Sequence, residues 1–271
     1  MEIVSPWGEI ARSAKARAKE IIDYRGMIKQ MFVRDLKLRY ERSVFGFAWT
    51  LLNPVAMLVV YTVFFSLIVR LGVPRYPIFL LSGLLAWNFI IRGMTGVSAV
   101  IWHNGYLINQ VRFPHESLII SGMLSLLVDF VFELVVLILV LVVLGMSLSP
   151  AIGFLPVAVF ILLIFGLGVS LFFAVWMSLY KDTEYIVGIA ALAWLYMTPV
   201  FYPISLIPQK YLGIYKLNPM VHMLNLFREP IYSGRLPGLE TLAISGLLAV
   251  GTLAIGWSLF KRYSPWFAEL M

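Results

Sequence analysis

The chain of 271 residues is 61% hydrophobic and 13% charged, with 21 Lys and Arg against 14 Asp and Glu. A soluble domain of this length carries about 25% charged residues, so the composition excludes the soluble class and indicates an integral membrane protein. The net charge of +7 does not indicate nucleic-acid binding, because ten of the basic residues precede Phe47 without a recognition motif. Anionic membrane lipids and a cytosolic partner account for them better. The absence of cysteine excludes disulfides and thiolate metal sites.

Residues 1–46 are predicted to form cytoplasmic amphipathic helices ahead of the membrane domain. The stretch 7–25 places small and apolar residues at helical spacing, with basic residues around the rest of the helix. The stretch 26–42 carries five basic residues, and its apolar residues share one face: Ile28, Phe32, Leu36 and Tyr40. Such a helix suits the membrane surface, where Lys and Arg reach the headgroups. A soluble helical hairpin is the alternative, but the direct run into a membrane span favours the interface.

Six apolar blocks follow and predict an all-α transmembrane domain over residues 47–262. The six blocks are 47–69, 77–100, 118–146, 151–178, 185–202 and 239–260. A straight span requires about 20 residues, so the long third and fourth blocks are expected to tilt or to extend beyond the bilayer. The fifth is short and ends at Thr198-Pro199, which predicts a broken helix end. A short cytoplasmic tail, 263–271, is expected to follow the last span.

Basic residues in the short loops predict that both the N-terminus and the C-terminus lie in the cytoplasm. With the N-terminus inside, 14 Lys and Arg fall on the cytoplasmic side and six on the outer side, and Arg92 lies within a span. The outer loop 203–238 contains five prolines, yet 211–217 and 221–227 are apolar enough to dip into the bilayer. We therefore expect two short re-entrant or interfacial helices before the last span.

Three charged residues are expected within the membrane. Asp129 and Glu133 are four residues apart in the third span and so face one side of the helix, and Arg92 in the second span lies at a compatible depth. Intramembrane carboxylates are costly and usually face the bundle or an aqueous path. The group is either a proton or cation relay or a structural ion pair. The structural interpretation is favoured, because a transported-ion site usually gathers ligands from more than one helix.

Two stripes of aromatic and polar residues are candidates for the lining of a translocation path. One follows span one, and the other follows span five and the segment after it. Their members are Asn53, Met57, Tyr61, Phe65, Tyr185, Tyr196, Phe201 and Tyr202. Aromatic faces stack against sugar rings, which suits weak sequential contacts. Interior packing and headgroup-level belts explain most aromatic residues of membrane proteins, so the stripes alone leave both interpretations open.

The sequence contains no motif for nucleotide binding or hydrolysis. It lacks G-x-x-x-x-G-K-[ST], H-E-x-x-H and G-x-S-x-G. Its three histidines, His103, His115 and His222, are scattered and are not expected to form one site. We therefore expect a chain that is not an enzyme and that holds neither a metal ion nor a cofactor of its own.

Several short segments together resemble the membrane subunit of type-2 ABC exporters, especially those for O-antigen-like polysaccharides or teichoic acids. The segments are RDLKLRY at 34–40, SVFGFAW at 43–49, LNP at 52–54, FLLSGL at 79–84, WNF at 87–89, NGYLI at 104–108, VRFP at 111–114, YKD at 180–182, TPVFYP at 198–203 and LNPM at 217–220. The likeness runs from about residue 28 to residue 262. Lys181 departs from the Arg of many relatives but preserves the charge.

The resemblance implies a permease that moves a lipid-linked polysaccharide out of the cytoplasm across the bacterial inner or plasma membrane, as in lipopolysaccharide biosynthesis. It implies a homodimer with two copies of a separate P-loop ATPase, which would bind the ATP and Mg. Spans one and five would line the pore, in agreement with the two stripes. The loop between spans two and three would be a coupling helix that docks on the ATPase, over Tyr106, Leu107, Ile108, Val111, Arg112, Phe113 and Pro114.

Three other classes remain open. A small-molecule or drug efflux permease would share the architecture, although such relatives often carry a large outer domain or a fused ATPase. An ion-coupled secondary transporter would use Asp129 and Glu133, but six spans without an inverted repeat disfavour it. A membrane enzyme acting on lipid-linked sugars would need a nucleophile or a metal cluster, and the sequence shows neither.

Overall fold

A computed structural model of the chain describes residues 20–41, 48–64, 72–111, 113–146 and 148–270. Within these ranges the chain is helical, with short connections and no β-strand, which confirms the predicted all-α class. Of the predicted helix 7–25, residues 7–19 lie outside the described ranges.

The helices follow the apolar blocks of the sequence. They are α2 (Arg25–Tyr40), α3 (Ala48–Val63), α4 (Tyr76–Arg92), α5 (Val100–His103), α6 (Gly105–Gln110), α7 (Glu116–Val143), α8 (Leu155–Leu179), α9 (Thr183–Met197), α10 (Gln209–Leu217), α11 (Pro219–Ile231), α12 (Leu239–Tyr263) and α13 (Phe267–Leu270). A π-helical turn, η2 (Gly93–Val97), joins α4 to α5. Three 3-10 turns complete the order: η3 (Pro150–Phe154), η4 (Ile204–Leu206) and η5 (Ser264–Trp266).

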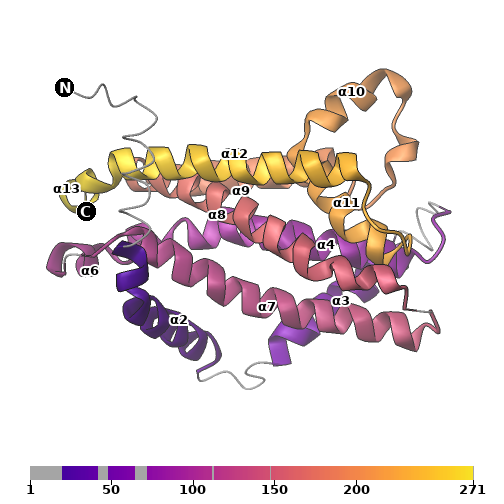
Figure 1. Ribbon diagram of the computed structural model, residues 1–271, viewed down its shortest axis with the longest axis horizontal. Coiled ribbons are helices and arrows are strands. Elements are labelled where there is room, and N and C mark those ends of the chain that lie inside the picture. The colour runs from indigo at the N-terminus through magenta and orange to yellow at the C-terminus, as the bar shows by residue number, and fades with distance from the viewer. Residues whose placement is uncertain (1–19, 42–47, 65–71, 112, 147, 271) are drawn as a thin grey trace, which may run out of the picture.

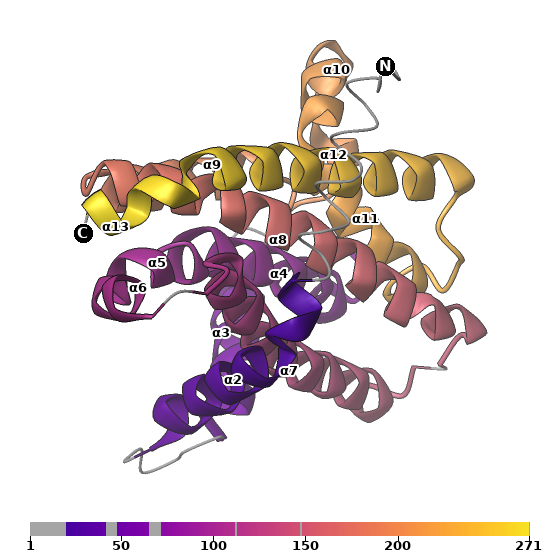
Figure 2. The same ribbon diagram turned by 60° about the vertical axis from the view of Figure 1, so that its left-hand side comes forward.

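The long helices lie side by side along the longest dimension of the molecule (Figure 1). The short helices α6 and α13 lie at one end, called here the α6 end, and α10 and α11 lie at the other, the α10 end. Figure 2 shows the same bundle from another side, with α10 projecting away from it. α11 by contrast packs against α4 and α12, and most of its side chains are buried.

Four helical stretches are long and apolar enough to cross a membrane: Tyr76–His103, Glu116–Val143, Pro150–Leu179 and Leu239–Trp266. They coincide with predicted spans two, three, four and six. α3 has 16 residues and α9 has 15, so each rises about 22–24 Å, which is less than the ~30 Å hydrocarbon core. Residues 65–71, where the first predicted span ends, lie outside the described ranges. The six-span arrangement and the re-entrant helices therefore stay predictions.

α4 lies at the centre of the bundle. Its side chains are buried along most of its length because α3, α7 and α11 pack around it. Aromatic contacts join α4 to α9 and to α7: Trp87 meets Trp194 of α9 at 5.3 Å between ring centroids, and Phe89 meets Phe130 of α7 at 5.0 Å. Such edge-to-face and tilted pairs are the preferred aromatic geometries.

Two glycines allow the extensive packing of α8 on α12. A Cβ added at Gly168 would collide with the backbone of Thr252 and Leu253, and one added at Gly256 would collide with the carbonyl of Gly168. Backbone atoms cannot swing aside as a flexible side chain can. Small residues that let two backbones approach in this way are characteristic of helix pairs in membranes.

Candidate functional site

The predicted coupling segment forms α6 at one end of the bundle (Figures 1 and 2). Tyr106 is 78% exposed and Val111 is 49% exposed, so both side chains are at the surface. Ile108 and Phe113 are instead buried, and Leu107 is half-buried. Only part of the predicted docking surface is therefore accessible to a partner. The remaining members are Pro114, which is buried, and Arg112, which lies outside the described ranges.

Phe113 is buried because the C-terminal segment folds back towards it. Its ring lies 5.4 Å from the ring of His115, which lies 6.0 Å from the ring of Phe267. Phe267 is fully buried and also meets Phe260 of α12 at 5.3 Å. His115 Nδ1 lies 3.2 Å from Ser264 Oγ. The predicted tail after residue 262 is thus helical, and η5 and α13 form a hook that packs on α6.

α9 presents an exposed face that begins and ends with a tyrosine. Tyr185 is 76% exposed and Tyr196 is 62% exposed, and Leu192 between them is also exposed. Separations of seven and eleven residues place these three side chains on one side of a helix. Val187 and Ala191 lie on the other side, buried with side chains of α8 and of the α4–α5 stretch. Of the predicted stripe, Tyr185 and Tyr196 on α9 are therefore exposed, whereas Phe201 is buried and Tyr202 is half-buried.

The ring of Phe201 lies close to other predicted path residues at the α10 end of α9. Its ring lies 5.1 Å from that of Tyr61 on α3 and 6.1 Å from that of Tyr196. The Tyr202 hydroxyl donates a hydrogen bond to the carbonyl oxygen of Tyr196 at 2.7 Å. Four predicted path residues thus form one aromatic cluster. The other candidates on the first stripe are Met57, which is exposed, and Asn53 and Phe65, whose side chains lie outside the described part of the chain.

Arg228 and Tyr76 hold the backbone that follows α9. The guanidinium of Arg228, on α11, donates hydrogen bonds to the carbonyl oxygens of Pro199 and Val200. The hydroxyl of Tyr76, at the start of α4, donates to the carbonyl oxygen of Phe201 at 2.9 Å. Three successive carbonyl groups of the non-helical segment after α9 are thereby satisfied by side chains, as buried backbone polar groups require.

Asn218 holds the same segment from a third direction. Its Nδ2 donates to Thr198 Oγ1 at 2.9 Å, and its Oδ1 accepts from Trp194 Nε1 at 3.0 Å. The same Oδ1 accepts from the backbone N–H of Met220 at 3.0 Å and so caps the start of α11. The predicted broken end of span five is therefore a defined junction that ties α9, α4 and α11 together.

Arg228 is buried, and carbonyl oxygens and an aromatic ring compensate its charge. Its guanidinium carbon lies 3.8 Å from the ring centroid of Phe79, a cation–π distance. Gly83, one turn along α4, leaves the necessary space, because a Cβ there would lie 2.6 Å from Arg228 Nη2. Burial lowers the pKa of Arg228 to about 9, which leaves it charged at neutral pH. In the sequence Arg228 is marked only as a basic residue of a loop, since its partners are distant along the chain.

The structure pairs two of the three predicted intramembrane charges. Arg92 Nη1 lies 2.9 Å from Glu133 Oε1, and the Glu133 side chain is almost fully buried. Asp129 is also buried, one turn away on α7. Among the described residues no group of three or more His, Asp or Glu comes together in a way that could hold a metal ion. The ion pair is thus present, and the choice between a structural pair and a relay stays a prediction.

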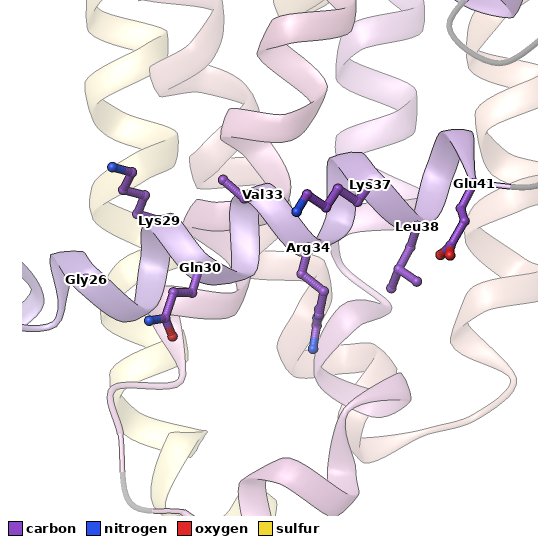
Figure 3. A pocket seen from close by; sticks show the side chains of 8 residues that line it. All are labelled: Gly26, Lys29, Gln30, Val33, Arg34, Lys37, Leu38 and Glu41. Carbon is purple, nitrogen blue, oxygen red and sulfur yellow. The ribbon is translucent and has the colours of Figure 1, made fainter.

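The outward face of α2 carries a shallow groove of about 670 Å³ with mixed basic and apolar walls. Figure 3 shows its side chains along the helix, among them Lys29, Lys37 and Leu38. Arg34 also lines it and pairs with the neighbouring Asp35 at 2.9 Å. α2 packs on α7, with Ile28 and Met31 buried and Phe32 and Leu36 half-buried. Its amphipathic character at a membrane surface stays a prediction.

Comparisons with known proteins agree with this architecture. Residues 27–232 match the family described as ABC-2 type transporter. The O-antigen export system permease protein RfbA of Myxococcus xanthus is 31% identical over 253 residues, which cover 93% of this chain and 97% of the relative. A Klebsiella pneumoniae protein of the same name is 30% identical over 240 residues, 88% of this chain and 92% of that protein.

A more distant relative is the polysialic acid transport protein KpsM of Escherichia coli. It is 24% identical over 240 residues, which cover 86% of this chain and 92% of the relative. Together with the matched family, these full-length similarities confirm the resemblance drawn from the short sequence segments. The chain belongs to the ABC-2 type transporter family.

Proposed function

We propose that this chain is the permease subunit of an ATP-driven exporter that moves a lipid-linked polysaccharide across the bacterial inner or plasma membrane. The observation that carries the proposal is the similarity, along nearly the whole chain, to permeases named for O-antigen export. The absence of a P-loop motif from the sequence fits a separate ATPase subunit. The proposal includes a homodimer with two ATPase copies, six spans and both chain ends in the cytoplasm.

In this proposal the α6 end faces the cytoplasm and receives the ATPase. The exposed side chains of Tyr106 and Val111 supply the apolar contact, and an exposed aromatic residue is a frequent anchor of protein interfaces. Phe113 serves the same function indirectly, because its ring meets His115, whose ring in turn meets Phe267 of the hook that packs on α6. A movement of the ATPase is then transmitted to the bundle through α6 and α13 together.

The translocation path is proposed along α3 and α9. α9 exposes Tyr185 and Tyr196 on one face, and Tyr61 of α3 meets the same aromatic cluster at the α10 end. A second copy of the chain would enclose these faces, and the aromatic side chains would offer successive stacking surfaces to the sugars. α9, with 15 residues, is too short to span hydrocarbon alone, which fits a helix that borders an aqueous path within protein.

α2 is proposed to lie at the cytoplasmic membrane surface. Lys29 and Lys37 are exposed on its outward face beside Val33 and Leu38 (Figure 3). Such a face places ammonium groups at the level of anionic headgroups while the apolar side chains enter the acyl boundary. The contact with α7 then links the position of α2 to the bundle.

Deleting the gene in its host tests the function. The cell-surface polysaccharide should disappear and the polymer should accumulate inside the cell, and the wild-type gene should restore export. Inactivating the P-loop lysine of the partner ATPase should give the same phenotype, since both subunits act in one step. Normal surface polysaccharide in the deletion strain would contradict the proposal.

The membrane topology is tested separately by tag accessibility. Tags after residue 271 and within α6 should be protected from a membrane-impermeant reagent, whereas a tag in α10 should react. If the tag in α10 is protected and the tag in α6 reacts, the molecule is oriented the other way and α6 does not dock the ATPase.

A further inference from the structure

A small pocket lies where α5, the end of α8 and the start of α9 meet. It has a volume of about 210 Å³, and its walls are formed by Ala99, Trp102, Met177, Lys181, Glu184 and Tyr185. Sites for drug-sized ligands measure ~300–1,000 Å³, so this pocket suits a single ring rather than an extended ligand. α5 and α6 are at the same end of the molecule (Figure 2). The pocket therefore lies at the α6 end, next to the coupling segment.

Aromatic and charged groups both line this pocket. Lys181 Nζ lies 4.8 Å from the centroid of the Trp102 ring, a cation–π contact. Glu184 and Tyr185 come from the first turn of α9, and both side chains are exposed. The pocket thus combines a strong donor, a strong acceptor and a free aromatic face.

The charges in and beside the pocket do not favour a phosphate ligand. Glu184 lines the pocket together with Lys181, and Asp182 is the residue that follows Lys181 in the chain, so the carboxylate offsets the ammonium group and a phosphate would gain no net attraction. A neutral ligand with several hydroxyl groups needs no net charge in the pocket. Its hydroxyls can donate to the carboxylate and accept from the ammonium, while its apolar ring face covers an aromatic side chain.

We propose that this pocket binds one sugar residue of the glycan at the cytoplasmic entrance of the path. The ring stacks on Tyr185, Glu184 accepts a hydrogen bond from a hydroxyl, and Lys181 donates one. Tyr185 is also the first residue of the exposed face that continues through Leu192 to Tyr196, so a sugar that leaves the pocket meets the path directly. The assignment rests on the proposed export function and on the orientation of the α6 end.

Site-specific photo-cross-linking tests the contact in the intact permease–ATPase complex. p-Benzoylphenylalanine placed at Tyr185 should give an adduct that a glycan-specific antibody detects after irradiation of cells that make the polymer. The same probe at Val143, which is 82% exposed at the far end of α7, should give none. A host that retains the lipid carrier but lacks the glycosyltransferases distinguishes contact with the sugars from contact with the lipid phosphate. In that host the adduct is detected as a mass increase of the purified permease, and an adduct of the same yield would identify the lipid phosphate as the ligand and overturn the sugar assignment.

A functional measurement gives an independent result. Lipid-linked glycan extracted from the host should stimulate ATP hydrolysis by the complex. In Glu184→Gln the glycan concentration that gives half of this stimulation should rise about tenfold or more, because a charge-assisted hydrogen bond is lost. Tyr185→Ala should act in the same direction. Matched controls are Glu240→Gln and Tyr211→Ala, at exposed positions of α12 and α10, and they should resemble the wild type.

A failure of the sugar-pocket assignment can be told apart from a failure of the proposed export function. If the wild-type complex exports glycan but both pocket variants match their controls and Tyr185 captures no glycan, the sugar pocket is wrong and the export function stands. If the wild-type complex neither exports glycan nor responds to it, the proposed function itself is wrong.

Discussion

Arg228 shows at the residue scale how a buried charge can replace a helix capping motif. Its two hydrogen bonds satisfy the carbonyl oxygens of Pro199 and Val200, which a proline-broken helix leaves open. The contact with Phe79 and the absence of a side chain at Gly83 complete a cavity shaped for a planar guanidinium. Lysine could supply the charge but not two parallel donors.

Replacing Arg228 with methionine should destabilise the permease markedly. Each buried carbonyl left without a partner costs about 1–3 kcal/mol, so the total for the two should be about 2–6 kcal/mol. Arg228→Lys should fall between this variant and the wild type. Thermal unfolding of the purified protein in detergent measures the effect. Arg235→Met, at an exposed position of the same loop region, serves as the control. An equal loss of stability in Arg228→Met and Arg235→Met would refute the stabilising role of the Arg228 hydrogen bonds, called here the Arg228 clamp.

Gly83→Ala should disturb the Arg228 clamp from the side of α4. Its Cβ would lie 2.6 Å from Arg228 Nη2, so the guanidinium must leave the two carbonyl groups, at a cost of about 1–3 kcal/mol. In the Arg228→Met background the clash is relieved, and the cost of Gly83→Ala should be smaller. A double-mutant cycle by thermal unfolding measures this coupling. Gly251→Ala, where a new Cβ meets no neighbour, should show no coupling to Arg228→Met.

The C-terminal hook acts at the scale of whole elements, because it fixes α6 without being adjacent to it in sequence. Phe267→Ala removes a fully buried ring that meets both His115 and Phe260. The resulting cavity should cost about 3–5 kcal/mol locally and let α6 shift on the bundle. We expect several-fold more ATP hydrolysed per glycan exported in proteoliposomes. Trp266→Ala changes an exposed neighbour and should keep the wild-type ratio; a similar loss in both variants would argue against the hook.

The elements themselves could be predicted from the sequence, because apolar length alone identifies a membrane helix. The break after Met197 and the position of α6 were likewise predictable, from proline and from the resemblance. The burial of Phe113 could not be predicted in this way. An apolar residue on the charged side of the membrane predicts a docking surface, yet Phe113 packs near a helix that begins at Phe267. Arg228, Tyr76 and Asn218 were missed as a site for the same reason: their partners lie 20 to 125 residues away.

For the whole molecule, the central question is how a motor bound at one end opens a path along the bundle. The two ends differ in a way that fits this task. At the α6 end, the exposed side chains of the coupling segment lie on and just after a short helix that packs on the hook. At the α10 end, hydrogen bonds hold the segment that follows α9. In the proposed orientation, a push on α6 would reach the start of α9 through Trp102 and Lys181, while the other end of α9 stays anchored.

This arrangement predicts that the ATPase binds through the exposed members of the coupling segment and not through the buried ones. Tyr106→Ala combined with Val111→Ala should weaken binding of the ATPase at least tenfold without changing thermal stability, because both side chains face solvent in the free subunit. Phe113→Ala should instead lower the unfolding temperature, since its ring is buried against His115. Binding of the purified ATPase to the permease in nanodiscs, measured by titration, separates the two effects.

The matched control uses an exposed tyrosine and an exposed valine at the opposite end. Tyr211 on α10 and Val143 at the end of α7 are both accessible, and their double alanine variant should bind the ATPase with the wild-type affinity. If this variant loses affinity and the Tyr106 and Val111 variant keeps it, the motor sits at the α10 end. The hook, the sugar pocket and the anchored exit of α9 would then face the wrong sides of the membrane, because each of these assignments depends on α6 being cytoplasmic.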